Sequence, residues 1–494
     1  MYEIQHRIAG EAFTDPDGRT GPVFNPATGE QAGAVSLASE ATVDVAVAAA
    51  KAAAPAWAAT SLSRRTKLLF AFRNLVEKHT DDLAKVLTAE HGKTLDDSRG
   101  EIARGLENIE YATAITEHMK GEMSHDVSTG IDVHTIRQPL GVVAGITPFN
   151  FPAMVPLWML PNAVATGNAF ILKPSERDPS AGMLVAELFD EAGFPPGVLG
   201  LVNGDKVAVD RLLHHPDVDG VSFVGSTPVA KYIHSTAIEN GKRVQALGGA
   251  KNHMIVLPDA DIDLAADAAV SAGYGSAGER CMAISVVVAV GSVADPLVDA
   301  IATRIPKIAV GAGDEPGTEM GPLITEEHRD RVKGYVDGAT EEGASVVVDG
   351  RDGLPAEGYF LNPTLLDNVQ PGMACYDDEI FGRVLSVMRV GGYQDGIETI
   401  NASPFANGTA IFTRDGGAAR QFQFDVQVGM VGINVPVPVP VSYYSFGGWK
   451  ASLFGDTHMY GPEGINFYTQ AKVVTSKWPD PATSSVDLGF PETR

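Results

Sequence analysis

Apolar residues recur along the chain with two spacings, and the change from one to the other divides the predicted fold. Up to about Lys120 they recur at helical spacing, which predicts amphipathic helices over residues 41–59 and 67–90. Residues 127–139 then alternate between apolar and polar, a pattern typical of an exposed strand or hairpin.

From Gly141 onward, short Val- and Ile-rich runs alternate with segments of helical length. The predicted strands are 142–146, 169–172, 199–202, 220–224, 254–257, 285–290 and 471–476, with helices that begin near Ser180 and Pro228. Strands that alternate with helices at this spacing predict right-handed crossovers and a parallel sheet. We therefore expect two α/β domains with a small strand-rich appendage.

Composition narrows the possible partners. The 494 residues carry a formal net charge of −25, which argues against nucleic-acid and membrane partners because phosphate and anionic lipid would be repelled. The N-terminus lacks the pattern of a signal peptide, and three prolines interrupt the apolar stretch 151–172, so neither secretion nor a membrane span is expected. No cysteine or histidine spacing indicates a metal site. These features predict a cytoplasmic protein.

Cys281, one of only two cysteines, follows a glycine-rich turn over residues 273–278. Glycines let a backbone approach a ligand closely, and the adjacent Arg280 is expected to favour the thiolate that a nucleophile requires. A buried small hydrophobe is the alternative interpretation of such a cysteine. Cys375 has acidic neighbours, which raise the pKa of a thiol, so it is expected to be inert.

Three polar segments follow predicted strands, where turns open onto the sheet edge at which α/β folds bind ligands. Asn150 lies between aromatic residues and prolines, and its amide could stabilise an oxyanion, with a structural turn amide as the alternative. Lys173 and Glu176 suit the hydroxyls of a ribose. Ser226 lies in a small-residue turn that opens a helix, and helix N-termini bind phosphates.

Seven segments together resemble the aldehyde dehydrogenase superfamily, in chain order and over essentially the whole length. They are Pro148-Phe-Asn-Phe-Pro152, Lys173-Pro-Ser-Glu176, Phe223-Val-Gly-Ser226, Leu247-Gly-Gly249, Gly278-Glu-Arg-Cys281, Glu379-Ile-Phe-Gly382 and Phe446-Gly-Gly-Trp-Lys450. The resemblance implies an α/β fold with a Rossmann-like NAD-binding domain, an α/β catalytic domain and a small β oligomerisation flap. The implied bounds are 1–123 and 141–247 for the NAD-binding domain, 248–441 for the catalytic domain, 124–140 and 468–484 for the flap, and 442–467 for a return to the NAD-binding domain at the active-site edge.

The same resemblance implies roles for individual residues. Cys281 would be the nucleophile, and Asn150 with the Cys281 backbone N–H would form the oxyanion hole. The implied contacts to NAD are Lys173 and Glu176 at the adenosine ribose, Ser226 near the pyrophosphate, Glu379 at the nicotinamide ribose, and further Thr147, Phe149, Arg177 and Gly248. Glu176 favours NAD over NADP, because a carboxylate would repel the 2′-phosphate. No metal is implied.

One position separates this chain from the hydrolytic members of the superfamily. Those members resemble E-L-G-G-K, in which the glutamate activates water. Counted back from Cys281, that slot holds Leu247, and residues 244–249 contain no carboxylate. Without a base for water, a thioester on Cys281 is expected to persist until a better nucleophile arrives, and a thiol is one.

Three local strings are similar to methylmalonate-semialdehyde dehydrogenase, the CoA-acylating branch. They are Gly249-Ala-Lys-Asn-His253, Pro152-Ala-Met-Val-Pro-Leu-Trp158 and Gly278-Glu-Arg-Cys-Met282. In that branch two arginines hold the substrate carboxylate, and the matching residues are Arg104 and Arg280. For Arg104 alone, a solvated helix face is the alternative interpretation. Arg383 departs from the superfamily pattern, because many members have proline there.

The resemblance implies NAD-dependent oxidation and decarboxylation of methylmalonate or malonate semialdehyde, with coenzyme A as co-substrate, to propionyl-CoA or acetyl-CoA in valine or inositol catabolism. One alternative is a hydrolytic aldehyde dehydrogenase that forms a free acid. Another, of a different class, is a non-catalytic NAD-binding structural protein, which the presence of Cys281 and Asn150 disfavours. Exposed flap strands that pair between subunits predict a dimer or tetramer, with a homotetramer preferred.

Overall fold

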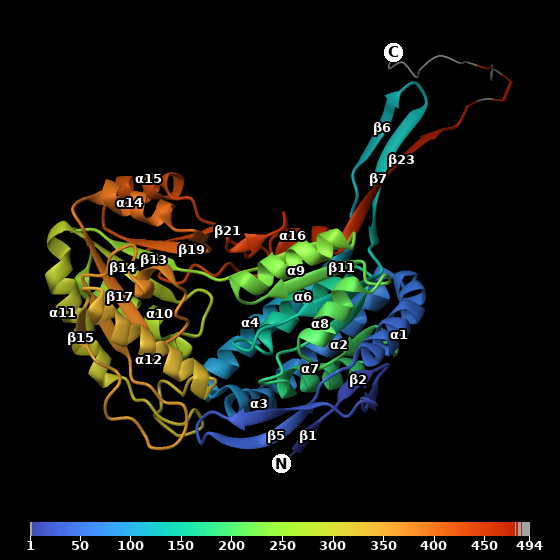
Figure 1. Cartoon of the computed structure of the whole chain (residues 1–494). Coiled ribbons are helices and arrows are strands. Elements are labelled where there is room, and N and C mark those ends of the chain that lie inside the picture. Colours follow the sequence, from blue (N-terminus) through green and yellow to red (C-terminus); the bar gives the residue numbers. More distant parts are fainter. Residues whose placement is uncertain (1, 480, 483–485, 487–494) are drawn as a thin grey trace.

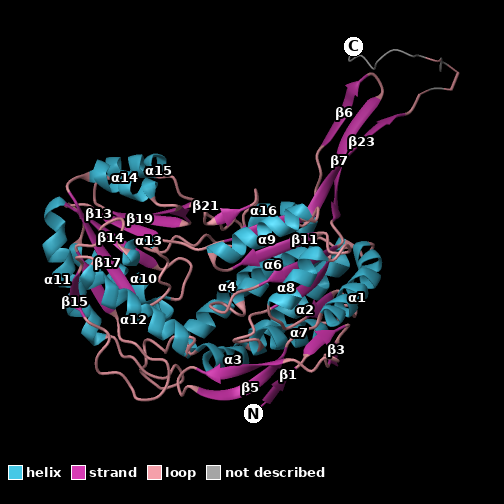
Figure 2. Ribbon diagram, viewed as in Figure 1, coloured by secondary structure: helices cyan, strands magenta, loops and turns pink. Residues whose placement is uncertain are grey.

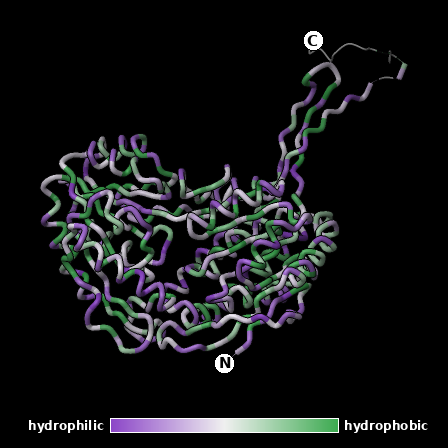
Figure 3. The backbone as a smooth tube through the Cα atoms, in the orientation of Figure 1, coloured by the Kyte–Doolittle hydropathy of each residue, from purple (hydrophilic) through white to green (hydrophobic). Residues whose placement is uncertain are grey.

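The computed structural model describes residues 2–479, 481, 482 and 486. They form two α/β lobes, each built on a mainly parallel sheet, and a narrow three-stranded sheet that projects away from both (Figure 1, Figure 2). The first lobe is blue to green in Figure 1 and the second is yellow to orange. Hydrophobic stretches of the chain run through the interior of both lobes (Figure 3).

The first lobe contains an eight-stranded sheet with the order β22-β12-β11-β8-β9-β10-β2-β3. The five central strands are parallel, and the edge strands β22, β2 and β3 are antiparallel. The strands are β2 (His6–Ile8), β3 (Glu11–Phe13), β8 (Val142–Ile146), β9 (Ala169–Lys173), β10 (Leu199–Leu201), β11 (Gly220–Val224), β12 (Arg243–Leu247) and β22 (Leu453–Phe454). Every residue of β8, β9 and β11 is buried because helices cover both faces.

Two separate apolar clusters attach those helices to the sheet. One cluster includes α2, α3, α4, α6, α7 and α16, and the other includes α1, α8 and α9. The bounds are α1 (Glu40–Ala58), α2 (Leu62–Lys78), α3 (Thr80–His91), α4 (Leu95–Thr113), α5 (Ile115–His118), α6 (Met154–Ala165), α7 (Ser180–Glu191), α8 (Lys206–His214), α9 (Thr227–Glu239) and α16 (Gly461–Phe467).

The second lobe contains a seven-stranded sheet with the order β15-β16-β17-β14-β13-β19-β20, parallel except for β15. Its strands are β13 (Asn252–Val256), β14 (Ile284–Val290), β15 (Ser345–Val348), β16 (Thr364–Asp367), β17 (Val384–Val390), β19 (Gly408–Phe412) and β20 (Met430–Ile433). Its helices are α10 (Ile262–Tyr274), α11 (Ala294–Arg304), α12 (Glu326–Glu341), α13 (Ala374–Asp377), α14 (Tyr393–Ala402) and α15 (Gly416–Asp425), with short 3₁₀ turns η1 (Gly275–Gly278), η2 (Gly291–Val293) and η3 (Ile305–Lys307).

The projecting sheet has the order β23-β7-β6, with β6 (Met123–Ser128), β7 (Ile131–Pro139) and β23 (Thr469–Lys477). β23 and β7 pair antiparallel over their whole lengths, from Thr469 opposite Pro139 to Lys477 opposite Ile131. The strands expected within 127–139 and 471–476 are therefore present and adjacent. Of the expected flap segment 468–484, residues 480, 483 and 484 lie outside the described residues.

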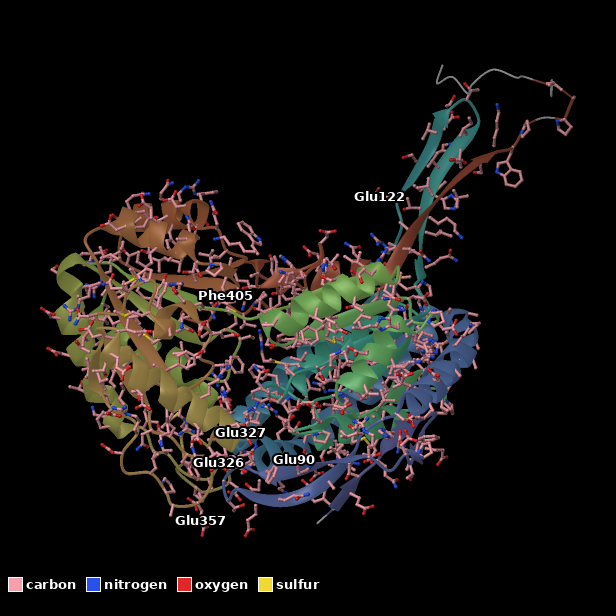
Figure 4. The ribbon with its side chains drawn as sticks, viewed as in Figure 1. Glu90, Glu122, Glu326, Glu327, Glu357 and Phe405 are labelled. Carbon is pink, nitrogen blue, oxygen red and sulfur yellow. The ribbon has the colours of Figure 1, made fainter. Side chains whose placement is uncertain are left out.

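Residues 442–467 connect the two lobes. Within this segment β21 (Trp449–Lys450) pairs with β18 (Phe405–Ala406) of the second lobe, and β22 then pairs with β12 of the first. Figure 4 labels Phe405, which lies opposite Lys450. A small additional sheet near the N-terminus has the order β1 (Tyr2–Ile4), β5 (Glu30–Ser36) and β4 (Thr20–Asn25).

The structure corrects one predicted helix. The single helix expected over 67–90 is two helices, α2 and α3, separated at His79, whose backbone is not helical (φ −100°, ψ 19°). The Thr80 hydroxyl donates to the carbonyl oxygens of Val76 and Glu77 at 3.3 and 2.9 Å. Side chains of this type compete for helix carbonyls, and the apolar spacing carries no sign of that competition.

The apolar stretch 151–172 forms the buried helix α6 and leads into β9. Among the described helices, none has both the length and the apolar character needed to cross a bilayer.

Candidate active site

Cys281 follows a strained turn between α10 and β14. Ser276 and Ala277 have φ of 50° and 57°, and Gly278 has φ of 76°. Left-handed backbone costs a residue other than glycine about 1–3 kcal/mol, and such strain concentrates at functional sites. A Cβ on Gly278 would collide with the Gly382 carbonyl. The turn therefore brings Cys281 against the Glu379–Gly382 segment, and both line one pocket.

Two asparagines that the sequence analysis did not single out hold the backbone of Cys281. The side-chain amides of Asn252 and Asn407 donate to the Cys281 carbonyl oxygen at 2.9 and 3.1 Å. Asn252 also donates to the Ala283 carbonyl at 2.9 Å, so the amides fix the backbone of residues 281–283. Asn252 lies within a string quoted for the family resemblance, whereas Asn407 comes from the turn before β19 and had no sequence signal.

Arg280 acts on the Cys281 thiol in the expected direction, but other effects outweigh it. Burial, reinforced by the nearby Glu379 carboxylate, raises the pKa of the Cys281 thiol to about 12, and the opposing effect of Arg280, which lowers this pKa, is smaller. Burial also raises the pKa of the Cys375 thiol, to which the acidic neighbours Glu342 and Asp377 contribute, as expected of an inert cysteine.

Asn150 lies in the turn that follows β8, at the carboxyl edge of the first sheet. Its buried side-chain amide donates to the Glu279 carbonyl oxygen at 2.9 Å, two residues before Cys281. A primary amide has two N–H donors, so one remains for a ligand. The structure thus brings Asn150 to the turn that precedes Cys281.

The Glu379 carboxylate lies over the Gly249–Ala250 backbone. It accepts the Ala250 N–H at 2.8 Å, and a Cβ on Gly249 would collide with it. Burial raises the pKa of Glu379 to about 7. Leu247, which ends β12 just before this loop, is buried, so an apolar side chain fills the slot of the water-activating glutamate.

The residues expected to contact a dinucleotide gather at the carboxyl ends of β8, β9, β11 and β12. The Lys173 ammonium pairs with the Glu176 carboxylate at 2.9 Å, and the Arg177 guanidinium lies 5.4 Å from the centre of the Phe149 ring. The Thr147 hydroxyl is buried without a hydrogen-bond partner among the described residues. Gly248 has no room for a Cβ, which would meet the Ala451 carbonyl oxygen at 2.7 Å.

Ser226 begins α9, and its side chain makes no capping hydrogen bond to that helix. The Ser226 hydroxyl and the N–H groups of Thr227 and Val229 are the donors that this helix start offers to a phosphate group, since Pro228 has no N–H. Lys173 and Glu176 lie at the end of β9, two strands away from β11 in the sheet. Together with these two residues, the donors at the start of α9 fit a dinucleotide.

The two arginines expected to hold a carboxylate approach the site from different elements. Arg104, on α4, pairs with Glu107 at 2.8 Å and donates to the Pro440 carbonyl at 2.9 Å. The Tyr460 hydroxyl donates to the same carbonyl at 3.0 Å, and the pKa of Tyr460, raised mainly by burial, also responds to both Arg104 and Cys281. Arg104 therefore packs against the Pro440 backbone beside Tyr460, with a side chain that is 32% exposed.

Arg280 is already engaged in an ion pair. Its guanidinium contacts the Asp97 carboxylate at 2.6 Å, and Asp97 belongs to α4, two turns before Arg104. Arg280 lines the pocket of Cys281 on one side and a cleft beside α10 on the other. Each of the two arginines thus has one carboxylate partner, and Arg104 also donates to the Pro440 carbonyl. A guanidinium has five N–H donors, so part of each remains for a ligand.

Glu279 is a fully buried carboxyl group that the sequence analysis quoted only as part of a motif. Its nearest ring nitrogens belong to His328 at 3.6 Å and His91 at 3.9 Å, and burial lowers the pKa of both imidazoles. Arg383, which replaces the usual proline, is also buried and donates to the Leu361 carbonyl. Burial raises the pKa of Glu279 to about 8, although the Arg383 charge opposes the shift.

We expect Glu279 to make stability fall as pH rises from about 5 to 8. Because the pKa of Glu279 is raised in the folded state, the folded protein keeps a proton on this carboxyl group at a pH where the unfolded chain has released it. This difference lowers the free energy of unfolding by up to about 5 kcal/mol at pH 8. Glu279→Gln removes this pH-dependent loss of stability, because glutamine does not titrate. The difference in melting temperature between variant and wild type should therefore grow in favour of the variant from pH 5.5 to pH 8.

Glu327→Gln, at an exposed position in the first turn of α12 (Figure 4), is the matched control for the substitution itself. A difference for Glu279→Gln that stays constant with pH would contradict the assignment.

Comparison with known proteins agrees with this geometry. The family model described as "Aldehyde dehydrogenase family" matches residues 13–474. A malonate-semialdehyde dehydrogenase of Pseudomonas aeruginosa is 54% identical over 99% of this chain and 100% of its own length. Malonate-semialdehyde dehydrogenase 2 of Geobacillus kaustophilus is 47% identical over 97% of this chain and 99% of its own length.

Solved structures agree as well. A methylmalonate-semialdehyde dehydrogenase of Oceanimonas doudoroffii superposes with a TM-score of 0.96 at 53% identity, over 98% of this chain and 99% of that one. A protein of Sinorhizobium meliloti, provisionally named methylmalonate-semialdehyde dehydrogenase and complexed with NAD, gives a TM-score of 0.96 at 50% identity over the same shares. This chain, with the fold and the nucleophile turn described above, belongs to the aldehyde dehydrogenase family.

Proposed function

We propose that the protein oxidises malonate semialdehyde and its 2-methyl derivative with NAD and transfers the resulting acyl group to coenzyme A. The observation that carries the proposal is the buried Leu247 in place of a water-activating carboxylate, beside a cysteine nucleophile. Two arginines near that cysteine suit an aldehyde that bears a carboxylate. The names of the relatives, malonate- and methylmalonate-semialdehyde dehydrogenase, support the same substrate class.

The reaction begins with attack of the Cys281 sulfur on the aldehyde carbon. The thiol proton passes to solvent water, and the carbonyl oxygen becomes an oxyanion that accepts hydrogen bonds from the Asn150 side-chain amide and the Cys281 backbone N–H. A single donor of this kind contributes about 10²–10³-fold to kcat. Arg104 and Arg280 bind the substrate carboxylate and so orient the aldehyde carbon toward the sulfur.

NAD, when bound, supplies the acceptor for the hydride that leaves the oxidised carbon. Lys173 and Glu176 would hold its adenosine ribose, Ser226 with the N–H groups of Thr227 and Val229 its pyrophosphate, and Glu379 its nicotinamide ribose. Thr147, Phe149, Arg177 and Gly248 line the same edge of the first sheet. Oxidation leaves an acyl thioester on Cys281.

The carbon–carbon bond to the carboxylate then breaks and carbon dioxide leaves, because the thioester carbonyl accepts the electron pair as an enolate, which takes up a proton. The thioester is not hydrolysed, since no base replaces the missing glutamate at Leu247. The thiol of coenzyme A attacks the carbonyl, releases acetyl- or propionyl-CoA and returns Cys281 to its free form.

The test compares NADH formation and acyl products with malonate semialdehyde and NAD, in the presence and absence of coenzyme A. Sustained turnover is expected only with coenzyme A, and acetyl-CoA is the expected product. Without it, we expect a single burst of about one NADH per active site, because the thioester accumulates. Full-rate formation of free acid without coenzyme A would overturn the acylating mechanism and indicate a base elsewhere, with the Glu379 carboxylate as the first candidate.

We further propose that the protein is a cytoplasmic homotetramer, a dimer of dimers, with small molecules as its ligands. The projecting sheet supports this proposal, because it extends away from both lobes (Figure 1) and the outer edges of β6 and β23 have no partner strand among the described residues. Val473 on β23 is 65% exposed, as an apolar residue at a subunit contact would be in an isolated chain.

A further inference from the structure

One face of α4 carries three charged residues, and each reaches the candidate active site. Asp97, Glu101 and Arg104 are spaced i, i+4 and i+7, so they lie on one side of the helix. Asp97 binds Arg280 and Arg104 binds the backbone at Pro440. Glu101, between them, is the buried member of the three.

The Glu101 carboxylate caps a helix that has no cap of its own. α6 begins without a side-chain hydrogen bond from Ala153, and one Glu101 oxygen accepts the backbone N–H groups of Ala153 and Met154 at 2.8 and 2.9 Å. A carboxylate at a helix N-terminus satisfies amides that the helix cannot and lies at the positive end of its dipole. The start of α6 is thereby tied to α4.

The other Glu101 oxygen binds the Lys93 ammonium at 2.6 Å, and that ammonium also donates to the Asn150 backbone carbonyl at 2.7 Å. The side chains of Lys93 and Glu101 are 1% and 0% exposed. The Lys93 ammonium further lies 4.6 Å from the centre of the Phe151 ring. Residues 150–154 form the turn that carries Asn150. Lys93 binds the start of this turn and Glu101 binds its end.

We infer that Lys93 and Glu101 are positioning residues for the Asn150 side chain, so that their ion pair sets the geometry of the oxyanion hole. The inference rests on the proposed role of Asn150 and does not depend on the identity of the aldehyde or of the acyl acceptor. A buried ion pair is weak support for stability alone, because apolar residues of similar volume are often equally stabilising. Its placement against the one turn that presents Asn150 points to a geometric function.

The test is a double-mutant cycle in which the pair is neutralised together. Lys93→Met with Glu101→Gln removes both charges at once, leaves no unpaired buried charge, and keeps an oxygen that accepts the two α6 amides. The loss is then confined to the contacts of the residue 93 ammonium with Glu101, the Asn150 carbonyl and the Phe151 ring. Single-turnover NADH formation with NAD is measured for the wild type, this double variant, Asn150→Ala and the triple variant.

We expect the double variant to lower the rate constant about 10- to 100-fold with an aldehyde KM within about threefold, since a misplaced donor loses part of the 10²–10³-fold effect of a whole one. In the Asn150→Ala background the same change should cost less than about twofold, because there is no donor left to position. An unchanged rate in the double variant, or an equal loss in both backgrounds, would overturn the inference.

Arg65→Met is the matched control. Arg65 is a buried cation that donates to the Ala165 carbonyl at 3.0 Å, at the opposite end of α6. Its replacement should lower the melting temperature and change the rate by the same factor whether or not Asn150 is present. Propanal is the aldehyde used, so that the cycle is readable even where malonate semialdehyde is not a substrate. NADH binding and melting temperature confirm that each variant is folded.

Discussion

Replacing Cys281 with alanine is expected to reduce NADH formation by at least about 10⁴-fold, while NAD binding and the melting temperature change little. Loss of a nucleophile has effects of this size because no other group can form the covalent intermediate. The surroundings of Cys281 point the same way: its carbonyl is held by two asparagine amides, and the preceding turn adopts left-handed backbone at Ser276 and Ala277.

Cys375→Ala is the matched control, since the chain has only these two cysteines. Cys375 is 1% exposed and packs in the apolar core of the second lobe, so its replacement should lower stability slightly and leave turnover within about twofold. Pre-steady-state NADH formation distinguishes the two variants. Activity of Cys281→Ala above about 1% of wild type, or an equal loss in Cys375→Ala, would remove Cys281 from the mechanism.

Replacing Arg104 with leucine is expected to lower kcat/KM for malonate semialdehyde about 100-fold and to leave kcat/KM for propanal within about threefold. A charge-assisted hydrogen bond to a carboxylate contributes about 1.5–3 kcal/mol, and each 1.4 kcal/mol is a factor of ten. Propanal has no carboxylate and so gains nothing from the arginine. The measurement is the ratio of the two specificity constants in wild type and variant.

Arg99→Leu provides the comparison on the same helix. Arg99 has a side chain 45% exposed and pairs with Asp81 and Asp96, on the side of α4 away from Cys281. Its replacement should leave both specificity constants nearly unchanged. Equal losses on the two aldehydes in Arg104→Leu would show that Arg104 supports the fold of the site and does not select the substrate.

The sequence predicts the parallel strands well, because a short, continuous apolar run bounded by turn residues is typical of a strand that is buried on both faces. The expected strands 142–146 and 220–224 coincide with β8 and β11. Asn150 and Ser226 follow these strands, as the sequence predicts, because the carboxyl edge of a parallel sheet follows from the strand order.

Other features could not be predicted from the sequence, because they depend on contacts between residues far apart in the chain. Asn407 holds the Cys281 carbonyl from 126 residues away, and Lys93 reaches Asn150 across 57 residues. The ion pair of Arg280 with Asp97 is of the same kind, because it joins residues 183 positions apart. The left-handed turn at Ser276 was hidden for a different reason, since neither Ser276 nor Ala277 is a residue type that favours that conformation.

The route of the chain through the two sheets constrains the order in which the protein is assembled during synthesis. The seven-stranded sheet uses one continuous stretch, from β13 to β20, and all of its strands have left the ribosome once Ile433 has emerged. The eight-stranded sheet begins earlier but takes its last strand, β22, from residues 453–454. The lobe translated second is therefore the first that can be completed, while the N-terminal lobe keeps β12 as an open edge until Phe454 has emerged.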